Sequence, residues 1–186
     1  IYVHDYKFNL EHSPKEENTN NSYYFRLTHT LNQDTFYRLS FNNFYTESYR
    51  GDGKYFKDLQ GYGRENPGRL FTDEALFYLG DDILTDVDEG VLWDDYFHRE
   101  SSYKGLKGEF TSQVNIRHQF KTGFDLERHT LRTYHHLSPS SLYEGSKRKY
   151  QDVDIYGYDE TGQKYVDEGL NGAKHPITSS YYAQDK

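Results

Sequence analysis

The stretch SYYFRLTHTLNQDTFYRLSFNNFYTES, from Ser22 to Ser48, decides the fold of this chain. On both sides of Asn32, Gln33 and Asp34, which favour a turn, apolar and polar residues alternate with the period of two that a β-strand requires. The apolar positions share one strand face: Tyr23, Phe25, Leu27, Leu31, Tyr37, Leu39, Phe41 and Tyr45. The stretch therefore predicts two antiparallel strands, 23–31 and 35–47, joined by a tight turn.

The lengths of the strands and of their connections indicate a membrane barrel. Each arm of about nine or more residues is longer than a usual soluble strand and can cross a hydrocarbon layer at the tilt of a barrel strand. The same alternation predicts four further strands, at 1–12, 106–117, 120–134 and 179–186. A second tight turn is expected at 117–119, whereas 48–105 and 135–178 are long loops. Short periplasmic turns that alternate with long extracellular loops are typical of outer-membrane barrels.

We therefore expect an all-β fold, an antiparallel transmembrane β-barrel segment of about five to six strands with two long extracellular loops. Aromatic residues make up 18% of the chain and 20 of them are tyrosine, which suits a membrane–water boundary. The mean hydropathy of -1.06 and the lack of a long apolar run exclude a spanning helix. The alternative is a soluble antiparallel sandwich, whose core would need more aliphatic residues than this chain supplies.

Three segments resemble barrel strands of TonB-dependent receptors. They are YYFRLTHTLNQDTFYRLSFNNFYTESYRGD from Tyr23, QVNIRHQFKTGFDLERHTLRTYHH from Gln113, and HPITSSYYAQDK from His175. The resemblance implies a 22-stranded barrel with an N-terminal plug domain, of which this chain is an internal piece of about a quarter. No plug domain and no TonB box is recognisable in the sequence. The implied location is the outer membrane of a bacterium.

The resemblance also implies a function, which is nutrient uptake. Extracellular loops would capture a scarce ligand and pass it through the lumen, with TonB acting through parts of the protein outside this chain. Siderophore, cobalamin, glycan and peptide receptors share the scaffold, so the ligand stays open. Polar strand positions expected to line the lumen are Arg26, Arg38, Gln113, Asn115, Asp125 and Glu127. The alternative function is a surface-exposed barrel that serves adhesion or complex formation without solute transport; a plug domain upstream would distinguish the two.

The acidity of the chain is concentrated in the first long loop. Between Phe71 and Glu100 there are ten acidic residues and one basic residue, a local charge of -9 in a chain whose net charge is -8. One interpretation is a solvated loop that charge keeps soluble. The other is a Ca²⁺ site, because hard cations prefer several carboxylate oxygens on a flexible loop, although the spacing does not match an EF-hand. The candidate ligands are Asp81, Asp82, Asp86 and Asp88.

Aromatic residues of the two loops are the candidate ligand platform. Exposed aromatic rings stack on sugars or aromatic chelates, and they could instead contact a surface lipoprotein that acts as a lid. The alternative is that the rings form the loops' own small core, since a long loop must pack against itself to stay ordered. The candidates are Trp93, Tyr96, His98, Tyr143, Tyr156 and Tyr158.

Two function classes are disfavoured by the sequence. The chain has no cysteine, no HExxH zinc motif and no GxSxG nucleophile motif, so we expect no enzyme activity. The negative net charge and the lack of a clustered basic stripe disfavour nucleic-acid binding, because phosphate neutralisation needs Lys and Arg.

Overall fold

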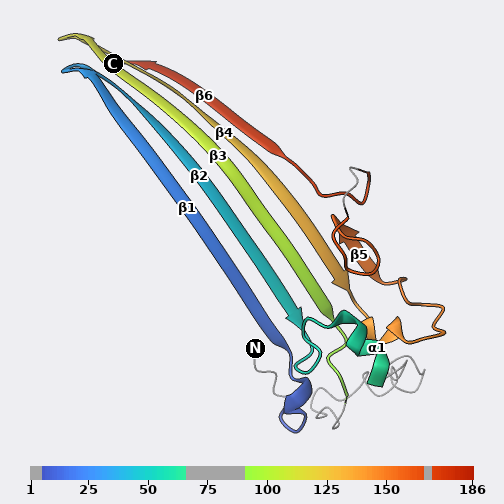
Figure 1. The fold of residues 1–186 in the computed structure, drawn as a ribbon. Coiled ribbons are helices and arrows are strands. Elements are labelled where there is room, and N and C mark those ends of the chain that lie inside the picture. The colour runs from blue at the N-terminus through green and yellow to red at the C-terminus, as the bar shows by residue number, and fades with distance from the viewer. Residues whose placement is uncertain (1–5, 66–90, 166–168) are drawn as a thin grey trace, which may run out of the picture. The chain divides into compact units, whose positions relative to one another are not determined.

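The computed structural model of this protein describes residues 6–65, 91–165 and 169–186. Within them the fold is all-β, as the alternation predicts. Four long strands lie side by side in one sheet, and two shorter strands pair with the fourth (Figure 1). In chain order they are β1 (Lys15–Asn32), β2 (Thr35–Gly51), β3 (Tyr96–Asn115), β4 (His118–His136), β5 (Val153–Tyr156) and β6 (Ile177–Asp185). The sheet formed by the described strands is open.

Short helices precede β1 and connect some of the later strands of the described chain. They are η2 (Leu10–His12), η3 (Leu59–Gly61), α1 (Tyr62–Glu65) and η5 (Pro139–Leu142). None of the helices in this part of the chain is long and apolar enough to cross a membrane.

The chain divides into two compact units, and the boundary falls within the long strands. The strand unit comprises Asn20–Thr46, Glu100–Leu131 and Lys174–Lys186. The loop unit comprises Ile1–Thr19, Glu47–Arg99 and Arg132–Ala173. The two units are described separately below.

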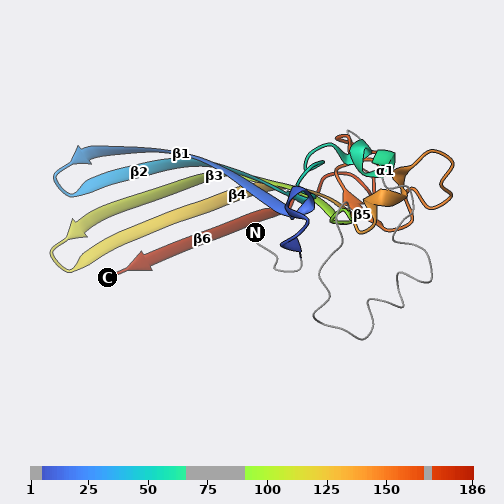
Figure 2. The same ribbon diagram turned by 90° about the horizontal axis from the view of Figure 1, so that it is seen from below.

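Asparagine side chains build both tight turns of the strand unit. Asn32 Oδ1 accepts a hydrogen bond from the backbone N–H of Asp34 at 2.9 Å. Asn115 Oδ1 accepts equivalent bonds from Arg117 and His118 at 2.8 and 3.1 Å. Such side-chain bonds to the following backbone explain why Asn favours turns. Figure 2 shows both turns and the end of β6 at the same end of this unit.

The register of the strand unit keeps apolar side chains on one face. β4 and β6 pair antiparallel, so that Phe124 lies opposite Tyr181 and Thr122 opposite Ala183. On the other face Arg38 of β2 reaches Glu109 of β3 at 3.2 Å. Large apolar side chains on the first face remain exposed to solvent in the chain: Tyr23, Phe25, Leu27, Leu31, Leu39, Phe41, Leu106, Val114, Phe120, Ile177 and Tyr181. This set is called the apolar face.

Several sequence-based boundaries differ from the structure. The prediction of a strand at 1–12 is wrong for its described residues, since 6–12 form turns and η2, held by bonds such as His12 N to Asn9 O at 3.1 Å. The polar residues 15–21 instead belong to β1. β3 begins at Tyr96 rather than 106, and the second turn lies at 116–117 rather than 117–119 because Asn115 caps it.

Tyrosines form the core of the loop unit. Tyr62, Tyr96, Tyr134 and Tyr158 follow one another edge to face, with successive ring centroids 6.0, 5.8 and 6.3 Å apart. Within the unit, the hydroxyl of Tyr134 donates to the carbonyl of Glu160 at 3.0 Å, and the hydroxyl of Tyr62 accepts from the backbone N–H of Asp52 at 2.6 Å. Further core residues are Leu59, Leu92 and Leu142. Tyrosine suits this core because its ring packs against apolar neighbours while a buried hydroxyl usually finds a hydrogen-bond partner.

Candidate functional site

The six residues predicted as a ligand platform are brought together only in part. Tyr96 and Tyr158 are 6% and 1% exposed, and both belong to the tyrosine core. This placement matches the alternative, a core formed by the loops themselves. His98 is also buried, whereas Trp93, Tyr143 and Tyr156 are half-buried. Ligand binding by the six stays a prediction, with the half-buried rings as its most accessible members.

Trp93 contacts the segment that precedes β1. Its ring meets that of Tyr6 edge to face, with centroids 5.7 Å apart. The Tyr6 hydroxyl donates to the carbonyl of Leu92 at 3.3 Å, and Asn9 Nδ2 donates to that of Val91 at 2.6 Å. Segment 6–12 is therefore a cover for the residues around Trp93, a role that its alternating sequence does not reveal.

A fully buried aspartate ties three segments of the loop unit together. Asp52 Oδ2 lies 2.8 Å from His12 Nδ1 and accepts the backbone N–H of Trp93 at 2.9 Å. Its Oδ1 accepts the N–H groups of Lys54 and Tyr55 at 2.9 and 3.1 Å. A buried carboxylate needs such partners to offset the cost of its desolvation. Sequence reasoning missed this residue because His12 and Trp93 are distant in the chain.

The acidic residues that follow Trp93 hold the two loops together. Asp94 accepts hydrogen bonds from Ser140 N and Ser140 Oγ, both at 2.7 Å. Asp95 accepts two bonds from Arg50, at 3.0 and 2.7 Å, and lies 2.6 Å from His135 Nε2. Part of the charge that the sequence assigns to one acidic loop therefore serves as structural hydrogen-bond acceptors.

Burial raises the pKa of Asp94 to about 6. The hydrogen bonds from Ser140 oppose this shift, and the negative charges of Asp95 and Asp52 add to it. A change in the charge of Asp94 is therefore expected close to physiological pH.

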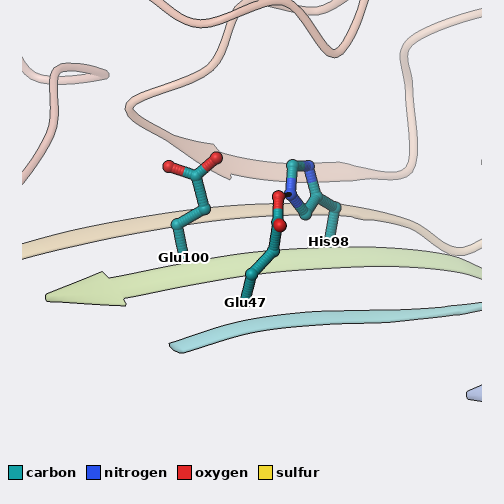
Figure 3. Close-up of side chains that lie close together, drawn as sticks. All are labelled: Glu47, His98 and Glu100. Atoms are coloured by element: carbon teal, nitrogen blue, oxygen red, sulfur yellow. Dashed lines mark hydrogen bonds and ion pairs between the residues drawn. The ribbon is translucent and has the colours of Figure 1, made fainter. Parts of the chain in front are cut away.

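Glu47 of β2 and His98 and Glu100 of β3 point to the same side of the sheet (Figure 3). One ligand atom of each lies within 4.8 Å of the others, and a histidine with two carboxylates is a donor set that suits Zn²⁺ and related metals. However, His98 Nε2 already lies 3.0 Å from Glu47 Oε1 and 3.3 Å from the hydroxyl of Tyr158. Its ring also stacks on Tyr49 at 3.9 Å, so an ion is not needed to explain the arrangement.

The calcium ligands proposed from the sequence are not part of this group. Asp81, Asp82, Asp86 and Asp88 lie outside the described residues, so calcium binding stays a prediction.

The polar face of the strand unit carries the residues predicted to line a lumen. Arg38 pairs with Glu109, and Arg26 Nε donates to the hydroxyl of Tyr24. Gln113 Nε2 donates to the carbonyl of Asn115 at 2.6 Å, and the Asn115 side chain itself caps the turn. These four predicted residues thus form a polar surface near the tight turns.

The remaining two predicted lumen residues lie further along β4. Glu127 Oε2 is 3.3 Å from His129 Nε2, and the His129 ring lies 5.5 Å from that of Tyr103. Tyr103 in turn stacks on Phe44 at 5.6 Å. Asp125 Oδ1 is buried and has no hydrogen-bond partner among the described residues, which is costly for a carboxylate unless water or another group reaches it.

Comparisons of the chain with protein-family models, with curated proteins and with solved structures find no match. The geometry of the two units is therefore the basis of the functional argument.

Proposed function

We propose that this chain is part of the β-barrel of an outer-membrane receptor that imports a scarce nutrient in a TonB-dependent manner. The observation that carries the proposal is the uncovered apolar face of the strand unit. Phe25, Val114 and Tyr181 on it are 65%, 67% and 73% exposed. An apolar patch of this extent is unfavourable in water and is expected only where another apolar phase covers it. Acyl chains of a bilayer supply that phase.

The opposite face of the same strands supports a polar lumen. Its pairs, such as Arg38 with Glu109 and Glu127 with His129, are half-buried polar contacts of the kind that line water-filled barrels. A soluble sandwich would bury one face against a second sheet. Phe25, Leu39, Val114 and Phe124 would then lie inside a compact core, and none of the four is buried.

The dimensions of the strands agree with a membrane crossing. β1, β2, β3 and β4 have 18, 17, 20 and 19 residues, whereas soluble strands usually have about five or six. A membrane strand needs about 9–11 residues to cross the hydrocarbon layer. The tight turns at 33–34 and 116–117 fit the periplasmic side, and the loop unit supplies the long connections on which receptors bind ligands.

Cells that produce the full-length protein test this function in two steps. The first is migration on a gel, where we expect an unheated sample to run as a folded barrel and a boiled sample to run more slowly. The second is growth on a panel of limiting nutrients, namely iron chelates, cobalamin, glycans and peptides. Deletion of the protein and deletion of TonB should abolish growth on the same nutrient.

The outcomes separate the alternatives. A soluble protein with no heat-dependent migration contradicts the barrel. A heat-modifiable protein whose deletion affects no nutrient, while adhesion is lost, contradicts import and supports the surface-exposed barrel instead.

A further inference from the structure

The apolar face of the strand unit is hollowed into a groove of about 650 Å³. Its lining includes the small residues Gly108, Thr122 and Ala183 and the larger residues Leu39, Phe124 and Tyr181. The six residues come from β2, β3, β4 and β6, so the groove crosses four strands. It lies wholly within the strand unit.

The lining of this groove is mostly apolar. The Phe124 ring lies over Gly108, where any Cβ atom would clash with it. The hydroxyl of Thr122 donates to the carbonyl of Tyr182 at 2.9 Å, so its hydrogen is already bonded and needs no acceptor on a bound ligand. A ligand in this groove would gain mainly from buried apolar area.

The charge around the groove selects the kind of occupant. Glu109 lies at its border, but its side chain is on the opposite face, where it pairs with Arg38 and Lys107. Beyond the groove, at the tight-turn end of β4 and β6, the basic residues Arg117, Lys121 and Lys186 outnumber the one acidic residue, Asp185, which pairs with His118 at 3.1 Å. An uncharged groove below a cationic end matches an amphiphile with an apolar chain and an anionic headgroup.

The length of the strands matches such a molecule. About seven residues separate the groove at Gly108–Phe110 from the turn at 116–117, which corresponds to about 23 Å along a strand. At a barrel tilt of about 45° this is ~16 Å along the membrane normal, close to half of the ~30 Å hydrocarbon core. An acyl chain whose headgroup sits at the turn therefore ends in the groove.

We infer that this groove holds one acyl chain of an anionic phospholipid from the periplasmic leaflet. The inference rests on the proposed membrane barrel and adds to it a lipid held in a defined position rather than one of many exchanging neighbours. The occupant is a lipid and not a second copy of the chain, because the cationic end of the groove has a counterpart in a phosphate group and none in an identical cationic end.

Two variants of β6 test the inference. Ala183→Trp fills the groove, because the small side chain of Ala183 lines it. Ser179→Trp is the matched control, since Ser179 lies on the same face of β6, opposite Leu126, but does not line the groove. Thr122→Leu is a second filling variant. Heat-modifiable migration of the full-length protein reports that each variant has folded.

Native mass spectrometry of the full-length protein, exchanged into detergent with phosphatidylglycerol, gives the readout. We expect one retained phosphatidylglycerol for the wild type and for Ser179→Trp. Excluding even two methylene groups lowers affinity about 15-fold, so both filling variants should lose the lipid. Phosphatidylethanolamine should be retained less than phosphatidylglycerol, and Arg117→Gln should remove this preference.

Equal retention by Ala183→Trp, Thr122→Leu and wild type would overturn the inference. So would a heat-modifiable wild-type protein that retains no lipid, and in that case the proposed barrel stands. A dimer that only the filling variants disrupt would show that a second copy occupies the groove. A wild-type protein that is soluble without detergent would instead refute the proposed function itself.

Discussion

Replacing Leu27 with arginine is expected to destabilise the membrane-inserted protein by about 2–4 kcal/mol, the cost of a cation on the lipid side of a barrel near the bilayer midplane. Leu27 lies on the apolar face and is 46% exposed in the chain. Five residues, 28–32, separate it from the turn that joins β1 to β2, which places it well inside the hydrocarbon layer of the proposed barrel. The long arginine side chain could reach water only by distorting the bilayer.

The neighbouring position supplies the control for this substitution. Thr28 is also exposed but lies on the polar face, so Thr28→Arg should change stability by less than about 1 kcal/mol. Urea titration of the full-length protein folded into lipid vesicles measures both effects. Equal destabilisation by the two variants, or a larger effect at Thr28, would contradict the assignment of faces.

The second large effect is expected at Asp94. It concerns how the stability of the loop unit depends on pH. Because burial raises the pKa of this carboxyl to about 6, the folded unit holds the proton more tightly than the unfolded chain does. The resulting stabilisation is complete below the ordinary Asp pKa of about 3.9 and is lost as the pH rises through about 6. The free energy involved is up to ~3 kcal/mol, from a shift of roughly two pKa units.

Asp94→Asn should remove this dependence. The uncharged amide can still accept the backbone N–H of Ser140 and no longer titrates. We therefore expect the stability of the variant, relative to wild type, to rise by up to ~3 kcal/mol between pH 4 and pH 7. Nearby Asp95, Asp52 and His135 are present in both proteins, so their contributions largely cancel.

Hydrogen exchange of residues 91–95 and 137–142, corrected for the intrinsic effect of pH on exchange, measures this difference. If the difference in stability between variant and wild type stays the same from pH 4 to pH 7, Asp94 keeps an ordinary pKa.

The strands could be predicted from the sequence because their signal is local. A period of two over nine or more residues identifies a strand and its faces without knowledge of any distant partner. The turn at Asn32–Asp34 was predicted for the same reason. Polar residues 15–21 carry no such period, yet β1 begins at Lys15. Pairing with a neighbouring strand extends β1 beyond what its side chains indicate.

The segment 6–12 shows where local reading fails. Its alternation predicts a strand, but Tyr6 and Asn9 bond to carbonyls more than eighty residues away and His12 bonds to Asp52. Contacts between residues so far apart in the sequence override a short alternating pattern. They cannot be predicted from the local sequence.

The sequence predicted which residues belong to the candidate site but not how they pack together. The sequence identifies the aromatic residues of the loops, and the structure divides them between a tyrosine core and half-buried rings. Whether a ring is a platform or a core residue depends on which loops pack together. Asp52 and Asp94 were beyond sequence reasoning for the same reason, since a buried aspartate is recognised only through its partners.

A spin-label scan of β1 tests the central claim most directly. The chain has no cysteine, so single cysteines placed at each position from Tyr23 to Leu31 can carry a nitroxide in the membrane-embedded full-length protein. We expect odd positions to be accessible to oxygen dissolved in lipid and even positions to a polar nickel chelate, with a period of two. Accessibility without this period, or protection of the odd positions from both reagents, would contradict an apolar face that contacts lipid.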